Sequence, residues 1–332
     1  MAGKPKVALY WCASCGGCEE TVVDLAEALL DVVAAIDIVF WPVALDFKRN
    51  DLEAMPDGTL LATFVNGAIR TTEQEEMARL LRCKSKLLLA FGSCSHLGGI
   101  PGLANLFDRQ SIFASIYRES PSTVNAEGVL PHLRHKDNGH TVELPGFYQT
   151  VRTLSQIVDV DYYVPGCPPT PRTVRTALQT LLGGELPPKG TLLAPDTALC
   201  EECPRKDSKP ENLSISQFKR PHEVLIDEEK CLLAQGLLCM GPATRGGCEA
   251  PCIHGNMPCT GCGGPTSRVK DQGAKILSSL ASLVEGKEVA EIDHALATIP
   301  DPVGSFYRYS LPSSLLRRKK LDNSKDLETS PR

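Results

Sequence analysis

The chain has 332 residues, enough for one large domain or two smaller ones, and a composition typical of a globular protein. Its formal net charge of -5 gives no reason to expect nucleic acid as a partner. The start, MAGKPKVALYW, has no export signal and no twin arginine, and no segment is apolar for long enough to span a membrane. We therefore expect a cytoplasmic protein, whose thiols stay reduced.

Five short apolar runs in the first half of the chain are typical of buried parallel strands. They are KVALYW (6–11), DIVFWPV (37–43), LLATFVNGAI (60–69), KLLLAF (86–91) and VDYYVPG (160–166). Helical patterns occupy 19–33, 71–81 and 168–182. Strands that alternate with helices predict the α/β class, with a flavodoxin-like, doubly wound parallel sheet over residues 1–190.

Fourteen cysteines are clustered along the chain, and glycine and proline crowd around most of them. Clustered cysteines in a reducing compartment bind metal more often than they cross-link the chain. Irregular backbone can aim several sulfurs and amide N–H groups at one point. The pattern therefore favours metal or iron–sulfur sites.

Three of the expected strands run into cysteine motifs. The first leads to Cys12, Cys15 and Cys18, the fourth to Cys94 in GSCSHLGG, and the fifth to Cys167 in VPGCPP. Loops at the carboxyl ends of parallel strands converge on one crevice, which predicts a four-thiolate site of Cys15, Cys18, Cys94 and Cys167. Cys12 and Cys15 also have C-x-x-C spacing, but Cys12 is closer to the strand and is expected to point into packing. The alternative for Cys94 and Cys167 is a role as small buried residues.

The segment 199–264 carries eight more cysteines, in an expected irregular, cysteine-rich domain over 191–270. They are Cys200, Cys203, Cys231, Cys239, Cys248, Cys252, Cys259 and Cys262. Eight thiols make two sets of four, which suits two cubane iron–sulfur clusters, although two structural zinc sites would use the same ligands. Only two of the four pairs have C-x-x-C spacing, which favours iron–sulfur clusters over zinc. Helical segments at 271–286 and 288–299 and a polar tail are expected to complete the third region, 271–332.

The order of these motifs resembles that of the small subunit of nickel–iron hydrogenases over about residues 5 to 265. C-x-x-C-E-E follows the first strand, GSC-x-x-x-GG the fourth and PGCPP the fifth, and the second half has C-x-x-C, M-G-P, G-G-C and P-C-x-x-C in the family's order. The resemblance implies three [4Fe-4S] clusters in a row. The proximal cluster would be held by Cys15, Cys18, Cys94 and Cys167, the medial one by Cys248, Cys252, Cys259 and Cys262, and the distal one by Cys200, Cys203, Cys231 and Cys239. Cys12 and Cys83 remain without a cluster.

Two positions differ from the best-known periplasmic members of that family. Cys200 stands where many of them have a histidine, and Cys252 stands where many have a proline and a three-iron medial cluster. A fourth thiolate should permit a full cubane and lower its reduction potential. These features indicate the cytoplasmic branch. Within it, the resemblance implies the F420-non-reducing or methyl-viologen-reducing type, which passes electrons through an iron–sulfur adaptor to a heterodisulfide reductase.

The resemblance implies an electron-transfer subunit of an oxidoreductase that acts on H2. Electrons would enter one at a time from a nickel–iron centre in an obligate large subunit, which we expect to contact a large apolar surface around the proximal cluster. Glu20, two residues after Cys18, matches a family position near the subunit interface and is a candidate proton relay; an acid that complements the helix dipole is the alternative. His96 and His254, beside cysteines, are candidates for roles at the clusters.

Three other functions would use parts of the same pattern. A hydrogenase of this kind could instead reduce F420 or NAD(P) through other chains, and no Gly-rich dinucleotide motif follows a strand in this one. A complex I-like iron–sulfur module would explain the first site and leave the later eight cysteines unused. A zinc protein without enzymatic activity would hold zinc at the same thiols.

Overall fold

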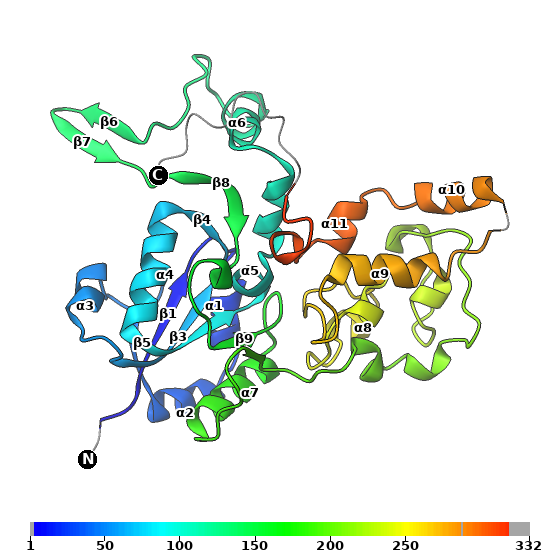
Figure 1. The fold of residues 1–332 in the computed structure, drawn as a ribbon, viewed down its shortest axis with the longest axis horizontal. Helices are drawn as coiled ribbons and strands as arrows, with labels where there is room; N and C mark the ends of the chain where they lie inside the picture. The colour runs from blue at the N-terminus through cyan, green and yellow to red at the C-terminus, as the bar shows by residue number, and fades with distance from the viewer. Residues whose placement is uncertain (1–2, 287, 319–332) are drawn as a thin grey trace.

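The computed structural model describes residues 3–286 and 288–318 (Figure 1). A part built on a central sheet lies beside a second part of short helices and loops, which contains the cysteine-rich segment. The expected polar tail begins at LRRKK (316–320), and from residue 319 on it lies outside the described residues. Within the described ranges, none of the helices has the length and apolar character needed to cross a membrane.

The central sheet has six parallel strands. Their order across the sheet is β2 (Asp37–Phe40), β1 (Lys6–Trp11), β3 (Leu60–Asn66), β5 (Ser85–Phe91), β9 (Tyr162–Val164) and β10 (Thr191–Leu192). The strand order is that of a flavodoxin-like sheet: β2 is added on one side of β1, and β3 and all later strands of the sheet are added on the other side. The predicted fold class is confirmed.

Strand β5 shows why these apolar runs form buried strands. Leu87, Leu89 and Phe91 belong to the core on one face of the sheet, and Leu88 and Ala90 belong to the core on the other. Successive side chains of a strand point to opposite faces, so a run that is apolar at every position must be covered on both faces.

Helices cover both faces of the sheet. The first core is closed by α1 (Gly17–Val23), α2 (Ala28–Ala35) and α7 (Pro171–Leu182), and the second by α3 (Arg49–Ala54) and α4 (Thr72–Lys84). The single helix expected over 19–33 is wrong: α1 ends at Val23, and Ala26 has a left-handed φ of 51° before α2 begins. The short helix α3 was not predicted.

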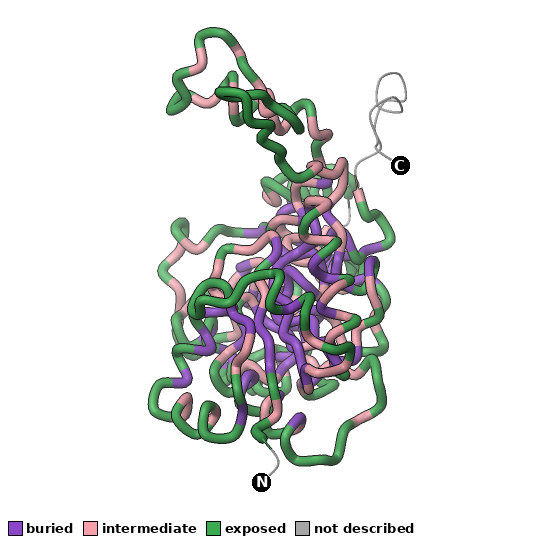
Figure 2. The backbone as a smooth tube through the Cα atoms, turned by 90° about the vertical axis from the view of Figure 1, so that its left-hand side faces the viewer, coloured by how far each residue is buried: buried purple, intermediate pink, exposed green. Residues whose placement is uncertain are grey.

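A long insertion separates β5 from β9, and the sequence did not predict its elements. It contains α5 (Ser93–Leu97), a 3-10 helix (Ile100–Leu106), α6 (Arg109–Ala114), a π-helical turn (Ser115–Glu119), β6 (Arg134–Asp137), β7 (His140–Glu143), β8 (Phe147–Arg152) and a 3-10 turn (Leu154–Gln156). We call residues 109–146 the arm. Figure 2 shows the arm projecting from the body, with mostly exposed residues, and β6 and β7 form its antiparallel hairpin.

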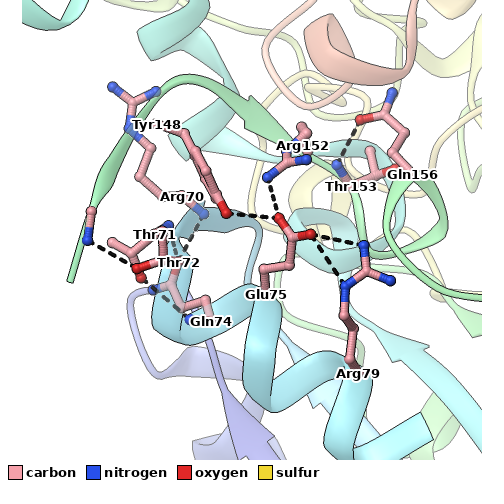
Figure 3. A network of polar contacts seen from close by, with 11 residues as sticks. Arg70, Thr71, Thr72, Gln74, Glu75, Arg79, Tyr148, Arg152, Thr153 and Gln156 are labelled. Carbon is pink, nitrogen blue, oxygen red and sulfur yellow. Dashed lines mark hydrogen bonds and ion pairs between the residues drawn. The ribbon is translucent and has the colours of Figure 1, made fainter. Parts of the chain in front are cut away.

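The insertion is fastened to the sheet part through β8, as Figure 3 shows. Strand β8 pairs antiparallel with β4 (Ile69–Thr71), and Glu75 of α4 accepts hydrogen bonds from Tyr148 Oη (2.8 Å) and Arg152 Nη2 (2.6 Å). Arg79 also donates to Glu75 from the next turn of the helix. Burial alone would raise the pKa of Glu75, but these three donors more than offset it and lower the pKa below its usual value.

The second part has its own apolar core, with little regular structure. Its elements are 3-10 turns at Leu199–Glu201, Lys206–Ser208, Pro221–Glu223, Leu233–Gln235, Gly241–Ala243 and Leu311–Ser313, and helices α8 (Pro251–His254), α9 (Gln272–Ala281), α10 (Val289–Ala297) and α11 (Pro302–Phe306). Helices α9 and α10 lie within the two segments predicted to be helical. The boundaries at residues 190 and 270 stay a prediction.

The end of the described chain returns to the sheet part. Gln156 Nε2 donates to the carbonyl of Pro312 (2.9 Å), and Asn105 Nδ2 donates to the carbonyl of Arg317 (2.9 Å). These bonds join segments more than 150 residues apart in sequence. The two parts therefore make contact through residues 312–317, near the end of the described chain.

Candidate metal centres

Three loops at the carboxyl edge of the sheet bring the first four predicted cysteines together. Cys15 and Cys18 follow β1, Cys94 follows β5, and Cys167 follows β9. Burial, followed by the charge of nearby thiols of this set, raises the pKa of Cys94 to about 11 and that of Cys167 to about 12. The pKa of Cys18 is also raised, chiefly by burial and then by Cys94, Cys167 and Cys15.

Glycines leave room for these sulfurs. A Cβ at Gly92, where φ is +83°, would lie 2.4 Å from Cys18 Sγ, and a Cβ at Gly99 would lie 2.4 Å from Cys94 Sγ. Both positions have a positive φ, which glycine adopts without strain. The space beside the two sulfurs thus exists only because these residues have no side chain.

The second predicted set, in the cysteine-rich part, surrounds a cavity of about 260 Å³. All four members, Cys248, Cys252, Cys259 and Cys262, line this cavity, and so does Cys167 of the first set. Burial raises the pKa of Cys262 to about 12; among the other causes, Cys248, Cys167 and Cys252 raise it and a backbone N–H lowers it. The first and second sets are therefore neighbours.

A serine hydroxyl joins these two neighbouring sets. Ser93 Oγ lies 2.8 Å from the carbonyl oxygen of Gly166 and 2.5 Å from that of Cys262. Ser93 is fully buried and precedes Cys94, and Gly166 precedes Cys167. One side chain thus connects the loops after β5 and β9 to the cysteine-rich part.

The third predicted set lines a smaller pocket, of about 30 Å³, further from the sheet. Cys200, Cys203, Cys231 and Cys239 face it among mostly apolar residues, with Arg205 and Lys209 also in the lining. A Cβ at Gly241 would lie 3.3 Å from Cys200 Sγ. Burial, followed by the three other thiols, raises the pKa of Cys200 to about 12.

The second and third sets also touch. The N–H of Met240, next to Cys239, donates to the carbonyl of Cys259 (2.9 Å), and Cys239 contributes to the raised pKa of Cys259, after burial. The three sets therefore form a series, in which the second lies between the other two.

The donor chemistry fits iron–sulfur clusters. Every cysteine of the chain is a free thiol, and each set offers four sulfurs with glycine-lined or apolar surroundings. In the part of the chain that the structure describes, no three His, Cys, Asp or Glu side chains converge as the ligands of one metal ion would. A four-iron cluster binds each cysteine at a different iron, so its ligands stand further apart than those of one ion. The assignment of the twelve ligands stays a prediction.

Two cysteines and two histidines near the thiol motifs are not members of these sets. Cys12 is buried in the second core of the sheet, as expected, and Cys83 is exposed at the end of α4. The ring of His96 stacks 4.6 Å from that of Tyr163; burial, and then Arg245, lowers the pKa of His96 to about 4, so it is neutral. His254 is exposed on α8.

The structure distinguishes the two glutamates after Cys18. Glu20 is exposed, and its role as a proton relay stays a prediction. Glu19 is 5% exposed, and its Oε1 accepts a hydrogen bond from Asn66 Nδ2 (3.4 Å). Burial raises the pKa of Glu19, although Asn66 and Trp41 partly offset this. Sequence reasoning missed Glu19; its spacing of three from the buried Val22 places both on the inner face of α1.

Comparison with known proteins gives one family model and several relatives. The model of the family described as "NADH ubiquinone oxidoreductase, 20 Kd subunit" matches residues 15–181. The iron–sulfur subunit of the F420-non-reducing hydrogenase of Archaeoglobus profundus is 39% identical over 317 residues, which cover 95% of this chain and 98% of the relative. The corresponding subunit of the F420-non-reducing hydrogenase of Methanothermobacter thermautotrophicus is 37% identical over 96% of this chain and 98% of the relative.

A solved structure supports the same architecture. A chain of the [NiFeSe]-hydrogenase of Dm. baculatum matches 80% of this chain and 95% of its own length, with a TM-score of 0.52. The sequence identity is 20%, so the match concerns the fold alone.

Proposed function

The chain belongs to the family of iron–sulfur subunits of F420-non-reducing hydrogenases, within the larger family of NADH ubiquinone oxidoreductase 20 Kd subunits, and from this premise we propose that it relays electrons through three [4Fe-4S] clusters. It is a small subunit of a hydrogenase, which is an oxidoreductase. The proposal adds the number of clusters, their ligands and the electron acceptor.

The serial arrangement of the three cysteine sets carries the proposal. Cys15, Cys18, Cys94 and Cys167 would hold the proximal cluster, Cys248, Cys252, Cys259 and Cys262 the medial one, and Cys200, Cys203, Cys231 and Cys239 the distal one. A cubane cluster accepts and releases one electron at a time, and burial and hydrogen bonds to sulfur tune its potential. Contact between neighbouring sets, at Cys167 and Cys262 and at Cys239 and Cys259, is what a relay requires.

A large subunit would hold the nickel–iron centre and cover the proximal set. Cys15 is exposed, and the ring of Trp11, 39% exposed, lies against Gly16 beside it. Val43, 57% exposed, and Phe47 belong to the loop after β2, which neighbours β1 in the sheet. A group of exposed apolar side chains at this edge suits an obligate interface, which is more apolar than ordinary surface.

The electron acceptor would lie beyond the distal set. We propose an iron–sulfur adaptor and a heterodisulfide reductase in the cytoplasm, because the relatives named above are F420-non-reducing enzymes. A module with the proximal cluster alone, as in complex I, would leave eight clustered thiols without a role. The name of the relatives speaks against F420 as the acceptor, and NAD(P) stays an alternative.

Purification of the native assembly with metal analysis tests the proposal. We expect nickel and a larger polypeptide to co-purify, about twelve irons on this chain, and EPR signals of several interacting reduced cubanes. Zinc in place of iron would refute the relay, and so would fewer than three clusters in freshly isolated protein. An intense three-iron signal from intact protein would contradict Cys252 as a ligand.

A further inference from the structure

The segment that carries Cys200 and Cys203 lies directly along the segment that carries Cys248. The N–H of Leu199 donates to the carbonyl of Thr244 (2.7 Å), and the N–H of Gly246 donates to the carbonyl of Thr197 (2.9 Å). Ala198 and Arg245 form the antiparallel bridge between these bonds. The first half of the distal motif is thus aligned with the start of the medial motif before either reaches its cysteines.

The Glu202 carboxylate completes this contact. Glu202 Oε2 accepts from the N–H of Gly247 (2.8 Å), and Oε1 accepts from the N–H of Glu249 (3.1 Å). Those two amides flank Cys248, whose Sγ lies 3.8 Å from Glu202 Oε1. The carboxylate therefore fixes the peptides before and after this cysteine and also places a negative charge beside its sulfur.

The backbone around Cys248 needs such support. Gly247 has a φ of +100°, Glu249 of +63° and Ala250 of +50°. Non-glycine residues rarely adopt this region, which costs of order 1 kcal/mol or more per residue, and turns of this kind expose N–H groups that bind anions. Charge-assisted hydrogen bonds from backbone N–H to carboxylate are stronger than neutral ones. Gly246 allows the approach, since a Cβ there would lie 3.2 Å from the carboxylate carbon of Glu202.

We propose that Glu202 is a positioning residue that links the distal and medial clusters: it holds the Cys248 loop in its ligand conformation and lowers the reduction potential of the medial cluster. The inference rests on the proposed function, because it requires a cluster on Cys248. A fixed negative charge close to a ligand sulfur opposes the addition of an electron, so its removal raises the potential.

The chain offers a matched control one residue away. Glu201 is also exposed and also lies between Cys200 and Cys203, but its carboxylate pairs with Lys206 Nζ (2.6 Å). Glu201→Gln and Glu202→Gln therefore remove the same charge from the same motif. The two variants differ in the contacts with Gly247, Cys248 and Glu249.

The test is an EPR-monitored redox titration, with iron analysis, of the native assembly carrying each variant. We expect a positive shift of the medial potential in Glu202→Gln, or loss of about four irons with the medial signal, and neither change in Glu201→Gln. If Glu202→Gln does not accumulate, Glu202→Asp moves the carboxylate back by one methylene, and we expect it to show loss of medial iron.

Two results would overturn the inference and can be told apart. A normal medial signal in the wild type, with the same potential and iron content in the Glu202 and Glu201 variants, refutes the role of Glu202 alone. A wild-type assembly without a medial four-iron signal refutes the proposed function and this inference with it.

Discussion

Gly92→Ala should remove the proximal cluster. The new Cβ would lie 2.4 Å from Cys18 Sγ, where ordinary contact begins at 3.4 Å, so the sulfur or the end of β5 must move by about 1 Å. Metal–ligand distances tolerate only about 0.2 Å, and the backbone at φ 83° and ψ 166° is nearly exclusive to glycine, with a cost of about 1–3 kcal/mol for alanine.

A second glycine separates the backbone effect from the effect on the sulfur. Gly58 also has a positive φ, +68°, but a Cβ there would meet nothing within 4 Å. Gly58→Ala should therefore cost about 1 kcal/mol of stability and retain all the iron.

Iron content and EPR of the purified assembly measure the difference. We expect about eight irons in Gly92→Ala, without the proximal signal, and about twelve in Gly58→Ala and in the wild type. Twelve irons and a wild-type proximal spectrum in Gly92→Ala would show that Cys18 is not held against Gly92 in the loaded protein, and the contact would then have no bearing on cluster binding.

Three further predictions concern other residues. Asp161 is buried and accepts from Arg82 Nη1 (2.6 Å), so Asp161→Asn should cost about 1–3 kcal/mol in urea unfolding at neutral pH. Burial opposes its ionisation, but Lys189, Arg82 and the N–H of Leu88 more than offset this and lower its pKa; the stabilisation is therefore present above the unfolded pKa of about 3.9 and is lost as the pH falls through the folded value. If the difference in the free energy of unfolding between wild type and Asp161→Asn stays the same from pH 6 to pH 3, the predicted pH dependence is wrong. Cys252→Ala should convert the medial cluster to a three-iron form, with about eleven irons and a new EPR signal in the oxidised state; loss of a distal signal instead would place Cys252 in another set. Cys12→Ala should retain all the iron and lower the thermal midpoint through a small cavity worth about 1 kcal/mol, and a loss of iron would make Cys12 a ligand.

The sheet was predictable because burial on both faces leaves a direct trace in the sequence. The runs 86–91 and 60–69 are apolar at nearly every position, and the structure places β5 and β3 in the middle of the sheet. The grouping of the first four cysteines followed from the same pattern, since parallel strands with cysteines after them bring those residues to one edge. The division of the later eight into two sets followed from the family resemblance instead.

The arm was not predictable by the same reasoning. Strands β6 and β7, RHKD and HTVE, are exposed at every residue and show no apolar face to reveal them. The break between α1 and α2 was missed because the apolar spacing continues through Ala26, and an alanine gives no sign in the sequence of the left-handed backbone that it adopts here. The burial of Glu19 was not predicted, because an acid near a cysteine does not indicate in the sequence which way it points; the role of Glu20 stays a prediction.

The cavity lined by cysteines of both the first and the second set has a consequence for electron transfer between them. Cys167 and Cys262 line the same cavity, so two centres held there would sit within a medium that screens charge far less than water does. An electron on one centre would repel an electron added to the neighbouring centre and so lower that centre's reduction potential. The reduction potentials of the two centres would therefore depend on each other's charge.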